Sequence, residues 1–372
     1  MDPAQRIARE ILQSADITVN GERPWDLHVH DQRFFGRVLA GGSLALGESY
    51  MDGWWDCESL DELVTRILSN DLQQKVKPSL KVFLLWLRSS LINRQRRSRA
   101  YNIGVRHYDL GNDLYRLMLD KGMNYSCGYW KRAKNLDDAQ LDKLELVCRK
   151  IGLGKGMRVL DIGCGWGGFA QHAAERYGCS VVGITVSREQ AQLAQERCKG
   201  LPVEIRLHDY RDIDERFDRI VSIGMIEHVG VKNYRRYMTT VARCLDPEGV
   251  FLLHTIGSNL SANVGDPWVD KYIFPDGMVP SVRQLSGASE GLFRIEDLHS
   301  FGHYYDPTLL AWNRNFTQGW DRIKERYGER FFRMWRYYLL SSAGSFRSRQ
   351  SQLWQIVLSP IKAAGVYVSI RD

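Results

Sequence analysis

The residues with the clearest chemical meaning form a glycine-rich stretch at 159–168, Val-Leu-Asp-Ile-Gly-Cys-Gly-Trp-Gly-Gly. The apolar residues at its start predict a strand that ends at Ile162, and a helix is expected to begin near Phe169. Glycine occupies every second position of the turn between them: Gly163, Gly165 and Gly167. Such glycines allow unusual backbone dihedrals and let a ligand approach the main chain closely. The glycine turn alone is weak evidence for a particular ligand, because dinucleotide enzymes use similar turns.

An acidic residue, Asp161, precedes these glycines. The combination of an acid with a GxGxG turn resembles the first motif of S-adenosylmethionine-dependent methyltransferases. A carboxylate attracts the cationic sulfonium of that cofactor, whereas a phosphate group would not need an acid beside it.

Polar side chains also follow the next two predicted strands, at 180–184 and 203–207. They are Thr185, Ser187, Gln190, Asp209 and Tyr210. The second strand end would usually contact the ribose and the third would usually hold the adenine, because ligands of open α/β sheets bind at the carboxyl ends of the strands. Asp209 could instead cap a helix, and Tyr210 could serve in packing.

Further apolar strands are expected at 219–223 and 250–256, with a helix around 136–151 before the first strand. Helical segments separate the early strands, and this alternation predicts a parallel, doubly wound sheet. We therefore predict a class I methyltransferase domain with a Rossmann-like fold, preceded by a small and mainly helical N-terminal domain.

The first 70 residues are expected to form short helices. Within them, residues 47–55 fit a packing and turn motif better than a functional site. The predicted organisation is an N-terminal lipid-associated domain at 1–90, a basic linker at 91–100 and a catalytic domain at 101–372.

Basic residues are concentrated between Leu72 and Tyr108, a span without Asp or Glu. The cations are Lys75, Lys77, Lys81, Arg88, Arg94, Arg96, Arg97, Arg99 and Arg106. Apolar residues recur among them at helical spacing: Leu80, Phe83, Leu84, Leu87 and Leu91. Such a helix suits an anionic lipid surface, but a core-packed helix followed by a solvated linker fits equally well. Nucleic acid is not expected, since no binding motif accompanies the charge.

Composition places the chain among ordinary globular proteins, with 372 residues, 44% hydrophobic residues and a net charge of +7. Its seven cysteines form no CxxC pair, which argues against a zinc site and a disulfide framework, so no metal is expected. Residues 1–20 lack an apolar signal core and no apolar run reaches membrane-spanning length, so we expect a cytoplasmic protein.

Several stretches resemble cyclopropane-fatty-acyl-phospholipid synthases along essentially the whole chain. They are Gly-Ser-Leu-Ala-Leu-Gly-Glu-Ser-Tyr-Met-Asp-Gly-Trp-Trp (42–55), His-Tyr-Asp-Leu-Gly-Asn-Asp (107–113), Tyr-Ser-Cys-Gly-Tyr-Trp (125–130), Gly-Met-Ile-Glu-His-Val-Gly (224–230), Leu-Leu-His-Thr-Ile-Gly (252–257), Asp-Pro-Trp (266–268) and Lys-Tyr-Ile-Phe-Pro (271–275). The mycolic-acid cyclopropane synthases share the catalytic half, but they lack an N-terminal domain like residues 1–90.

The resemblance implies that S-adenosylmethionine donates a methylene to the cis double bond of an acyl chain in a membrane phospholipid. An alkene is a weak nucleophile, so the two reactants must be held in a near-attack geometry. The carbocation that follows needs an electron-rich site without water, and a base must then remove one proton.

In the resembling family this base is a bound bicarbonate. Its expected ligands here are Cys127, Glu227, His254, the backbone of Ile256, and Tyr305. The same resemblance places Tyr125 and Ser126 at the cofactor. A shared proton would let Glu227 sit beside an anion, and Tyr305 with Tyr129 could present a π face to the cation. Tyr304 adjoins Tyr305, and either could face inward.

The resemblance further implies peripheral contact of the chain with the anionic inner face of the membrane, and a homodimer. Alternatives are a related lipid methyltransferase with methyl-branched or methylene products, a small-molecule methyltransferase, and a non-catalytic lipid-binding protein. The last would tolerate a damaged cofactor turn, whereas the acid and glycines of that turn are intact here.

Overall fold

The computed structural model describes residues 2–75 and 111–371, which form two compact units. One unit contains the described part of Met1–Asn93 together with Asn263–Pro275 and Tyr305–Ser351. The other contains the described part of Arg94–Ala262, Asp276–Tyr304 and Gln352–Asp372. The chain therefore passes more than once between the units, and its C-terminal third contributes to both.

A seven-stranded sheet in the order β5-β4-β3-β6-β7-β9-β8 forms the centre of the second unit. Its strands are β3 (Arg158–Ile162), β4 (Ser180–Thr185), β5 (Val203–Leu207), β6 (Phe217–Ile223), β7 (Leu245–Ser258), β8 (Phe293–Ser300) and β9 (Ser351–Pro360). The strands from β5 to β7 pair in parallel, and β8 pairs with β9 in the antiparallel direction. The predicted doubly wound sheet is confirmed, with the first three strands within one residue of their expected bounds.

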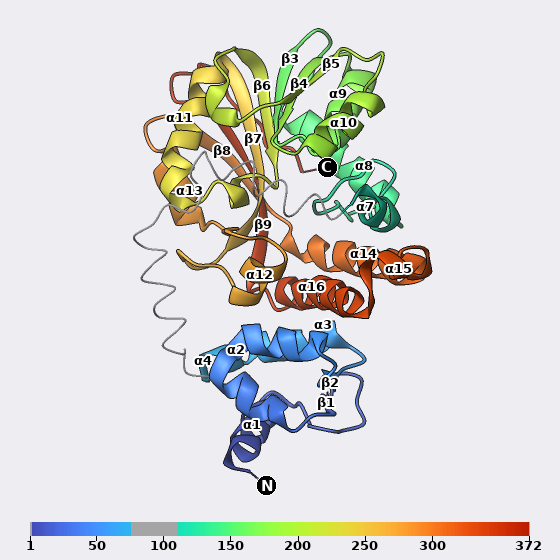
Figure 1. Cartoon of the computed structure of the whole chain (residues 1–372). Helices are drawn as coiled ribbons and strands as arrows, with labels where there is room; N and C mark the ends of the chain where they lie inside the picture. Colours follow the sequence, from blue (N-terminus) through green and yellow to red (C-terminus); the bar gives the residue numbers. More distant parts are fainter. Residues whose placement is uncertain (1, 76–110, 372) are drawn as a thin grey trace. The chain divides into compact units, whose positions relative to one another are not determined.

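Both faces of this sheet are covered by helices (Figure 1). The helices of this unit are α7 (Asn112–Met118), α8 (Leu136–Lys150), α9 (Gly168–Tyr177), α10 (Arg188–Arg197), α11 (Tyr234–Cys244) and α13 (Val282–Ser289). Val159 of β3 packs in a core with residues of α8, α9 and α10, whereas its neighbour Leu160 packs in a core with residues of α11 and α13. Successive strand residues point to opposite faces, so Asp161 lies on the α8 side.

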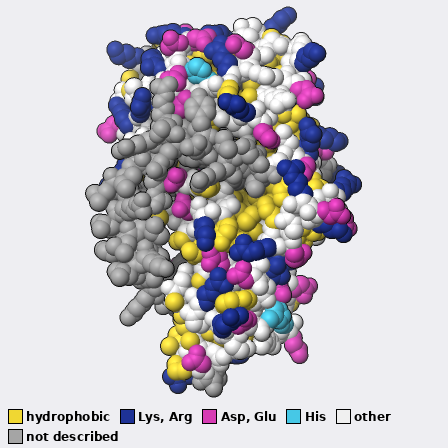
Figure 2. All heavy atoms as spheres, in the orientation of Figure 1, with side chains coloured by type: hydrophobic (Ala, Val, Ile, Leu, Met, Phe, Trp, Pro, Cys, Tyr) yellow, Lys and Arg dark blue, Asp and Glu magenta, His cyan; other side chains and the backbone are white. Residues whose placement is uncertain are grey.

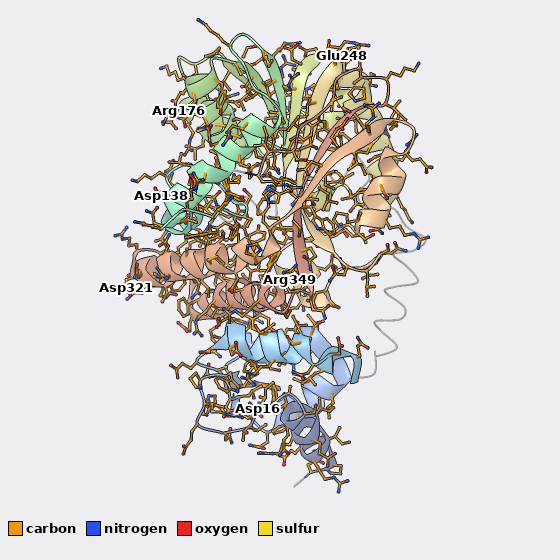
Figure 3. The ribbon with its side chains drawn as sticks, turned by 180° about the vertical axis from the view of Figure 1, so that it is seen from behind. Asp16, Asp138, Arg176, Glu248, Asp321 and Arg349 are labelled. Carbon is orange, nitrogen blue, oxygen red and sulfur yellow. The ribbon has the colours of Figure 1, made fainter. Side chains whose placement is uncertain are left out.

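Helix α8 begins after the N-cap residue Asn135. The side chain of Asn135 accepts a hydrogen bond from the backbone N–H of Asp138, which is labelled in Figure 3. Asp137 and Asp138 lie in its first turn, and Arg149 and Lys150 in its last. This charge order stabilises the helix through its dipole, and it fixes the register at which α8 presents side chains to β3.

The other unit is mainly helical, with a short antiparallel pair formed by β1 (His28–Val29) and β2 (Trp55–Asp56). Its helices are α1 (Pro3–Gln13), α2 (Arg33–Met51), α3 (Leu60–Ser69), α4 (Leu72–Lys75), α12 (Pro267–Tyr272), α14 (Tyr305–Gly319), α15 (Lys324–Tyr327) and α16 (Glu329–Arg347). Helix α16 packs against α2, α3 and α14. Arg347 forms ion pairs with Asp61 of α3 and Asp306 of α14, so charge as well as apolar packing joins the distant segments.

Charged side chains of both signs are interspersed over the described part of the face in Figure 2. In the helical unit, Asp16, labelled in Figure 3, pairs with both Arg23 and Arg66. Ion pairs of this kind are exposed, so solvent screens them and they contribute little to stability.

Some sequence expectations concern residues that the structure does not describe. The basic linker at 91–100, the apolar stripe from Leu80 to Leu91, and residues 107–110 of one family stretch lie outside the described residues. Within the described residues, no helix is both long and apolar enough to cross a membrane. No group of three or more metal-type side chains that could hold an ion occurs there either.

Residues 47–55 make a tight contact with α12, as their interpretation as a packing motif suggests. A Cβ atom built on Gly47 would lie 2.4 Å from the Trp268 indole, which is 1% exposed. The neighbouring Glu48 accepts hydrogen bonds from Lys271 and from the Tyr272 hydroxyl. Because Gly47 has no side chain, α2 can approach the buried Trp268 closely.

We predict that Gly47→Ala destabilises this unit by about 1–3 kcal/mol, because the added methyl group overpacks the contact with Trp268. Gly36→Ala is the matched control in the same helix, since nothing lies within 4 Å of its added Cβ. That substitution should stabilise by roughly 0.4–1 kcal/mol through the unfolded state. Denaturant unfolding followed by tryptophan fluorescence measures both, and equal midpoints for the two variants would contradict the packing argument.

Candidate active site

A pocket opens at the carboxyl ends of β3, β4 and β5, where the sequence placed its ligand. Its lining contains all the predicted cofactor residues except Gly167: Tyr125, Ser126, Asp161, Gly163, Gly165, Thr185, Ser187, Gln190, Asp209 and Tyr210. Residues separated by up to 85 positions in the chain are thus brought to one cavity, from Tyr125 to Tyr210. The parallel sheet accounts for this, because it aligns the ends of its strands along one edge.

Asp161 is the buried acid of the pocket, with 2% of its surface exposed. Burial raises the pKa of its carboxyl to about 7, while the Lys143 ammonium lowers it. Its Oδ2 atom has no hydrogen-bond partner among the described residues. A buried carboxylate without a direct partner is costly, so this atom is poised to accept a donor or a cation from a ligand.

The end of β4 forms a hydrogen-bonded turn into α10. The Thr185 hydroxyl donates to Gln190 Oε1 at 2.8 Å, and Ser187 Oγ accepts the backbone N–H of Gln190 as the N-cap of α10. These residues therefore stabilise the helix start as well as line the pocket.

Asp209 caps a helix, which is one of the two roles that its sequence position left open. Its carboxylate caps a short 3₁₀ helix through the backbone N–H of Arg211, and it pairs with the Arg211 guanidinium at 2.8 Å. It also lines the pocket, as does Tyr210, whose ring packs edge-on against Tyr237 at 5.0 Å.

The backbone conformation and close packing of the turn also require glycine at two of its positions. Gly163 has a φ of +83°, and a Cβ there would lie 2.8 Å from the Met225 side chain. Gly167 has a φ of +82° and faces Ala194 of α10, not the pocket. Close packing of α10 against the start of α9 explains why position 167 is a glycine. The spacing of the glycines alone did not distinguish this packing role from ligand binding.

Several pocket residues were not anticipated from the sequence: Met123, Asn124, Lys143, Trp166, Met225 and His228. Met225 and His228 belong to the family stretch 224–230, which offered a signal for them. Lys143 had none, because a lysine on an amphipathic helix normally faces water.

A second group of predicted residues lies at the ends of β6 and β7, outside the lining of this pocket. Glu227 lies in a 3₁₀ turn after β6, and its Oε1 accepts the backbone N–H of Ile256 at 2.8 Å. Burial raises the pKa of Glu227 to about 7, against the lowering effect of hydrogen bonds that include the Ile256 N–H. Its Oε2 has no hydrogen-bond partner in the described part of the chain.

His254 of β7 is 1% exposed, and burial lowers the pKa of its imidazole well below the usual value. The ring is therefore neutral at pH 7. Its Nδ1 lies 3.3 Å from Gln355 Nε2 on β9, and its Nε2 has no hydrogen-bond partner among residues 2–75 and 111–371. An amide N–H donated to Nδ1 leaves the ring proton on Nε2, where it can be donated to a ligand.

Cys127 is fully buried, and its thiol lies 3.3 Å from the carbonyl oxygen of Gly128. The ring of Tyr129 packs edge-on against Tyr304 at 5.3 Å. Tyr305 is also buried, but it begins α14 in the helical unit, where its ring lies 4.5 Å from that of Phe346. Tyr304 and Tyr305 thus belong to different units.

The comparisons with known proteins agree on one family. Residues 95–356 match the family model described as mycolic acid cyclopropane synthetase. The chain is 54% identical over 354 residues to the cyclopropane-fatty-acyl-phospholipid synthase of Escherichia coli K12, covering 95% of this chain and 93% of that one. It is 34% identical to the tuberculostearic acid methyltransferase UfaA1 of Mycobacterium tuberculosis, covering 87% and 80%.

Among solved structures, the chain is similar to the mycolic acid cyclopropane synthase CmaA1 complexed with SAH and CTAB. The TM-score is 0.66 and the sequence identity 31%, with 69% of this chain and 97% of that chain covered. The similarity therefore includes nearly all of a chain that binds the demethylated cofactor.

The burial of Glu227 predicts a pH-dependent effect on stability. A carboxyl whose pKa is raised on folding destabilises the native state once it ionises, so its unfavourable contribution grows from about pH 4.5 to about pH 7 and is constant above. Glu227→Gln removes this contribution. The free energy of unfolding of the variant minus that of the parent should rise across this range by up to about 3 kcal/mol. Urea unfolding at pH 5, 6, 7 and 8 measures the difference, and a pH-independent difference would contradict the assignment.

Proposed function

The chain belongs to the mycolic acid cyclopropane synthetase family, and we propose that it is a cyclopropane-fatty-acyl-phospholipid synthase. It is an S-adenosylmethionine-dependent methyltransferase. The reaction adds one CH₂ across the cis double bond of a phospholipid acyl chain and releases S-adenosylhomocysteine and a proton. The similarity to the E. coli enzyme along nearly the full length of both chains supports this substrate.

We propose that the pocket at the ends of β3, β4 and β5 holds the methyl donor. S-adenosylmethionine supplies an electrophilic methyl group on a sulfonium cation. The buried Asp161, with an unpartnered Oδ2, fits a cationic ligand. Thr185 and Gln190 are proposed for the ribose, and Asp209 with Tyr210 for the adenine, following their order along the sheet edge.

We further propose that bicarbonate binds near Glu227 and His254. When bound it would supply a base for the final proton. Two unpartnered buried atoms, Glu227 Oε2 and His254 Nε2, fit such a group, because a protonated carboxyl and a neutral imidazole can each donate to an anion. Cys127, Ile256 and Tyr305 are included from the sequence resemblance; in this structure the Ile256 N–H donates to Glu227.

The protein's own contribution is to bind, orient and exclude water. A carbocation formed on an acyl chain reacts with any water present, and the buried site residues limit that side reaction. Glu227 with a pKa of about 7 can hold or share a proton at neutral pH, so a carboxyl can lie beside an anion without full like-charge repulsion.

The decisive assay uses purified protein, methyl-labelled S-adenosylmethionine and vesicles with cis-unsaturated phospholipid. We expect acyl products heavier by one CH₂ and without olefinic protons, detected by mass spectrometry and NMR. Glu227→Gln should reduce turnover at least 100-fold, because its amide cannot share a proton with the anion as a carboxyl does. Glu196→Gln, an exposed glutamate on α10, is the matched control and should leave turnover unchanged.

Different outcomes separate the parts of this proposal. Products that gain CH₂ and keep an olefin would indicate a methylene-forming relative, and methyl-branched products would indicate a methyl-branching one. Turnover in CO₂-free buffer equal to turnover with added bicarbonate would contradict the bicarbonate site while leaving cyclopropanation intact.

We propose that residues 1–90 form the lipid-associated domain and that the basic residues between 75 and 99 hold the chain at the anionic inner face of the membrane. Each cation near anionic headgroups contributes about 1 kcal/mol. A cytoplasmic location and a homodimer are part of the same proposal, supported by the sequence resemblance and testable by light scattering.

Replacing Arg94, Arg96, Arg97 and Arg99 by glutamine should weaken binding to anionic vesicles at least tenfold at low salt. Sedimentation with vesicles of anionic and of neutral lipid gives the measurement. Binding of the parent should fall with added salt, since the attraction is screened. Unchanged binding of the variant to anionic vesicles would refute the proposed role of these arginines.

A further inference from the structure

A buried lysine lies against the cofactor pocket without any role in the proposed reaction. Lys143 of α8 is 1% exposed and lines the pocket. Burying an ammonium group is costly unless other groups compensate it. Desolvation lowers the pKa of Lys143 to about 8, so the lysine is mostly charged at pH 7. Its environment must therefore supply hydrogen bonds and negative charge.

The hydrogen bonds come from the loop that carries Tyr125 and Ser126. Lys143 Nζ lies 3.2 Å from Ser126 Oγ and 3.3 Å from Asn124 Oδ1. Gln140, one turn earlier on α8, donates through Nε2 to the carbonyl oxygen of Ser126 at 2.7 Å. One face of α8 thus fixes both the backbone and the hydroxyl of Ser126 at the pocket edge.

The negative charge comes from two carboxyl groups, Asp120 and Asp161, which both act on the Lys143 ammonium. Asp120 accepts hydrogen bonds from the backbone N–H and the side-chain amide of Asn124. Asp161 faces the α8 side of β3, two residues beyond Val159, which packs in the same core as Leu144 and Val147 of α8. Lys143 therefore interacts electrostatically with both Asp120 of the loop and Asp161 of the pocket.

The two acids near Lys143 differ in their surroundings. Asp120 lies outside the pocket lining, and the Arg197 guanidinium acts on it as well as Lys143. Within the lining, Asp209 pairs with Arg211 at 2.8 Å. The Oδ2 atom of Asp161 has no hydrogen-bond partner among the described residues, so Asp161 is the pocket acid that is open to a cationic ligand.

We propose that Lys143 is a positioning residue of the cofactor site, which favours the ionised form of the Asp161 carboxyl and orients the Ser126 hydroxyl for the cationic methyl donor. This inference rests on the proposed cofactor pocket and adds a residue that the reaction does not otherwise use.

Other titratable groups also face Asp161. They are Cys164 of the glycine turn, Cys198 after α10 and Tyr237 of α11, in addition to Lys143 of α8. Burial raises the pKa of all three, so they are neutral near pH 7. Lys143 is accordingly the cation that stabilises the Asp161 carboxylate among the described residues.

The test is the pH dependence of S-adenosylmethionine affinity, measured by calorimetry between pH 5.5 and 8.5. A ligand that requires ionised Asp161 binds more weakly below the pKa of that group, by tenfold for each pH unit. Lys143→Met removes the stabilising charge, so the midpoint of the affinity profile should move up by about one pH unit or more. Lys143→Arg keeps the charge and should keep the midpoint near that of the parent.

Asp120→Asn guards against a Lys143→Met variant that fails to fold. Asp120 is the main charge that raises the pKa of Lys143, so without it the lysine is less charged near pH 7 and the midpoint should move up, as in Lys143→Met. Lys121→Met, an exposed lysine of the same loop with 92% of its side chain accessible, should change nothing. Thermal unfolding of each variant separates loss of fold from loss of charge.

Each outcome decides a different claim. A midpoint that stays in place in Lys143→Met or in Asp120→Asn, whatever the affinity, overturns the role of Lys143. A parent protein that binds no S-adenosylmethionine at any pH overturns the proposed cofactor pocket itself.

Discussion

Desolvation of acidic side chains is the constraint on which the catalytic unit depends. Removing a carboxylate from water costs several kcal/mol unless charge or hydrogen bonds compensate it. Asp161 and Glu227 are both buried at the carboxyl-end edge of the sheet, and the pKa of each is raised to about 7. The surrounding chain must hold the compensating groups in place, which explains why α8 and the ends of β6 and β7 carry buried polar residues toward this edge.

The two acids differ in what compensates them. Asp161 has the Lys143 ammonium, whereas Glu227 has hydrogen-bond donors such as the Ile256 N–H and no cation among the causes of its shift. A nearby cation favours the ionised form, and burial without one favours the protonated form. Both carboxyl groups therefore titrate near neutral pH, and they differ in the groups that compensate them: a cation near Asp161 and hydrogen-bond donors at Glu227.

The parts of this fold that local pattern determines could be predicted from the sequence. Apolar runs gave the strands, and the glycine turn gave the pocket edge, because both depend on neighbouring residues. Lys143 and Gln355 could not be found in this way, since the first looks like a surface lysine and the second lies 101 positions from His254. Contacts between segments far apart in the chain also lie outside such local patterns. Helices α14 and α16 join the N-terminal helices through contacts such as Arg347 with Asp61, across 286 positions of the chain.

Neutral His254 is consistent with the charge movement that the proposed reaction demands. In the proposed reaction, positive charge would begin on the methyl donor, pass to the acyl chain and leave as a proton, so an additional imidazolium would disfavour both binding of the donor and formation of the carbocation. Burial lowers the pKa of His254, and the charges of Lys143 and Lys150 lower it further. The cation that stabilises Asp161 therefore also disfavours protonation of His254. One buried lysine thus acts in the same sense on two residues, because it lowers the pKa of Asp161 in the donor pocket and the pKa of His254 at the proposed anion site.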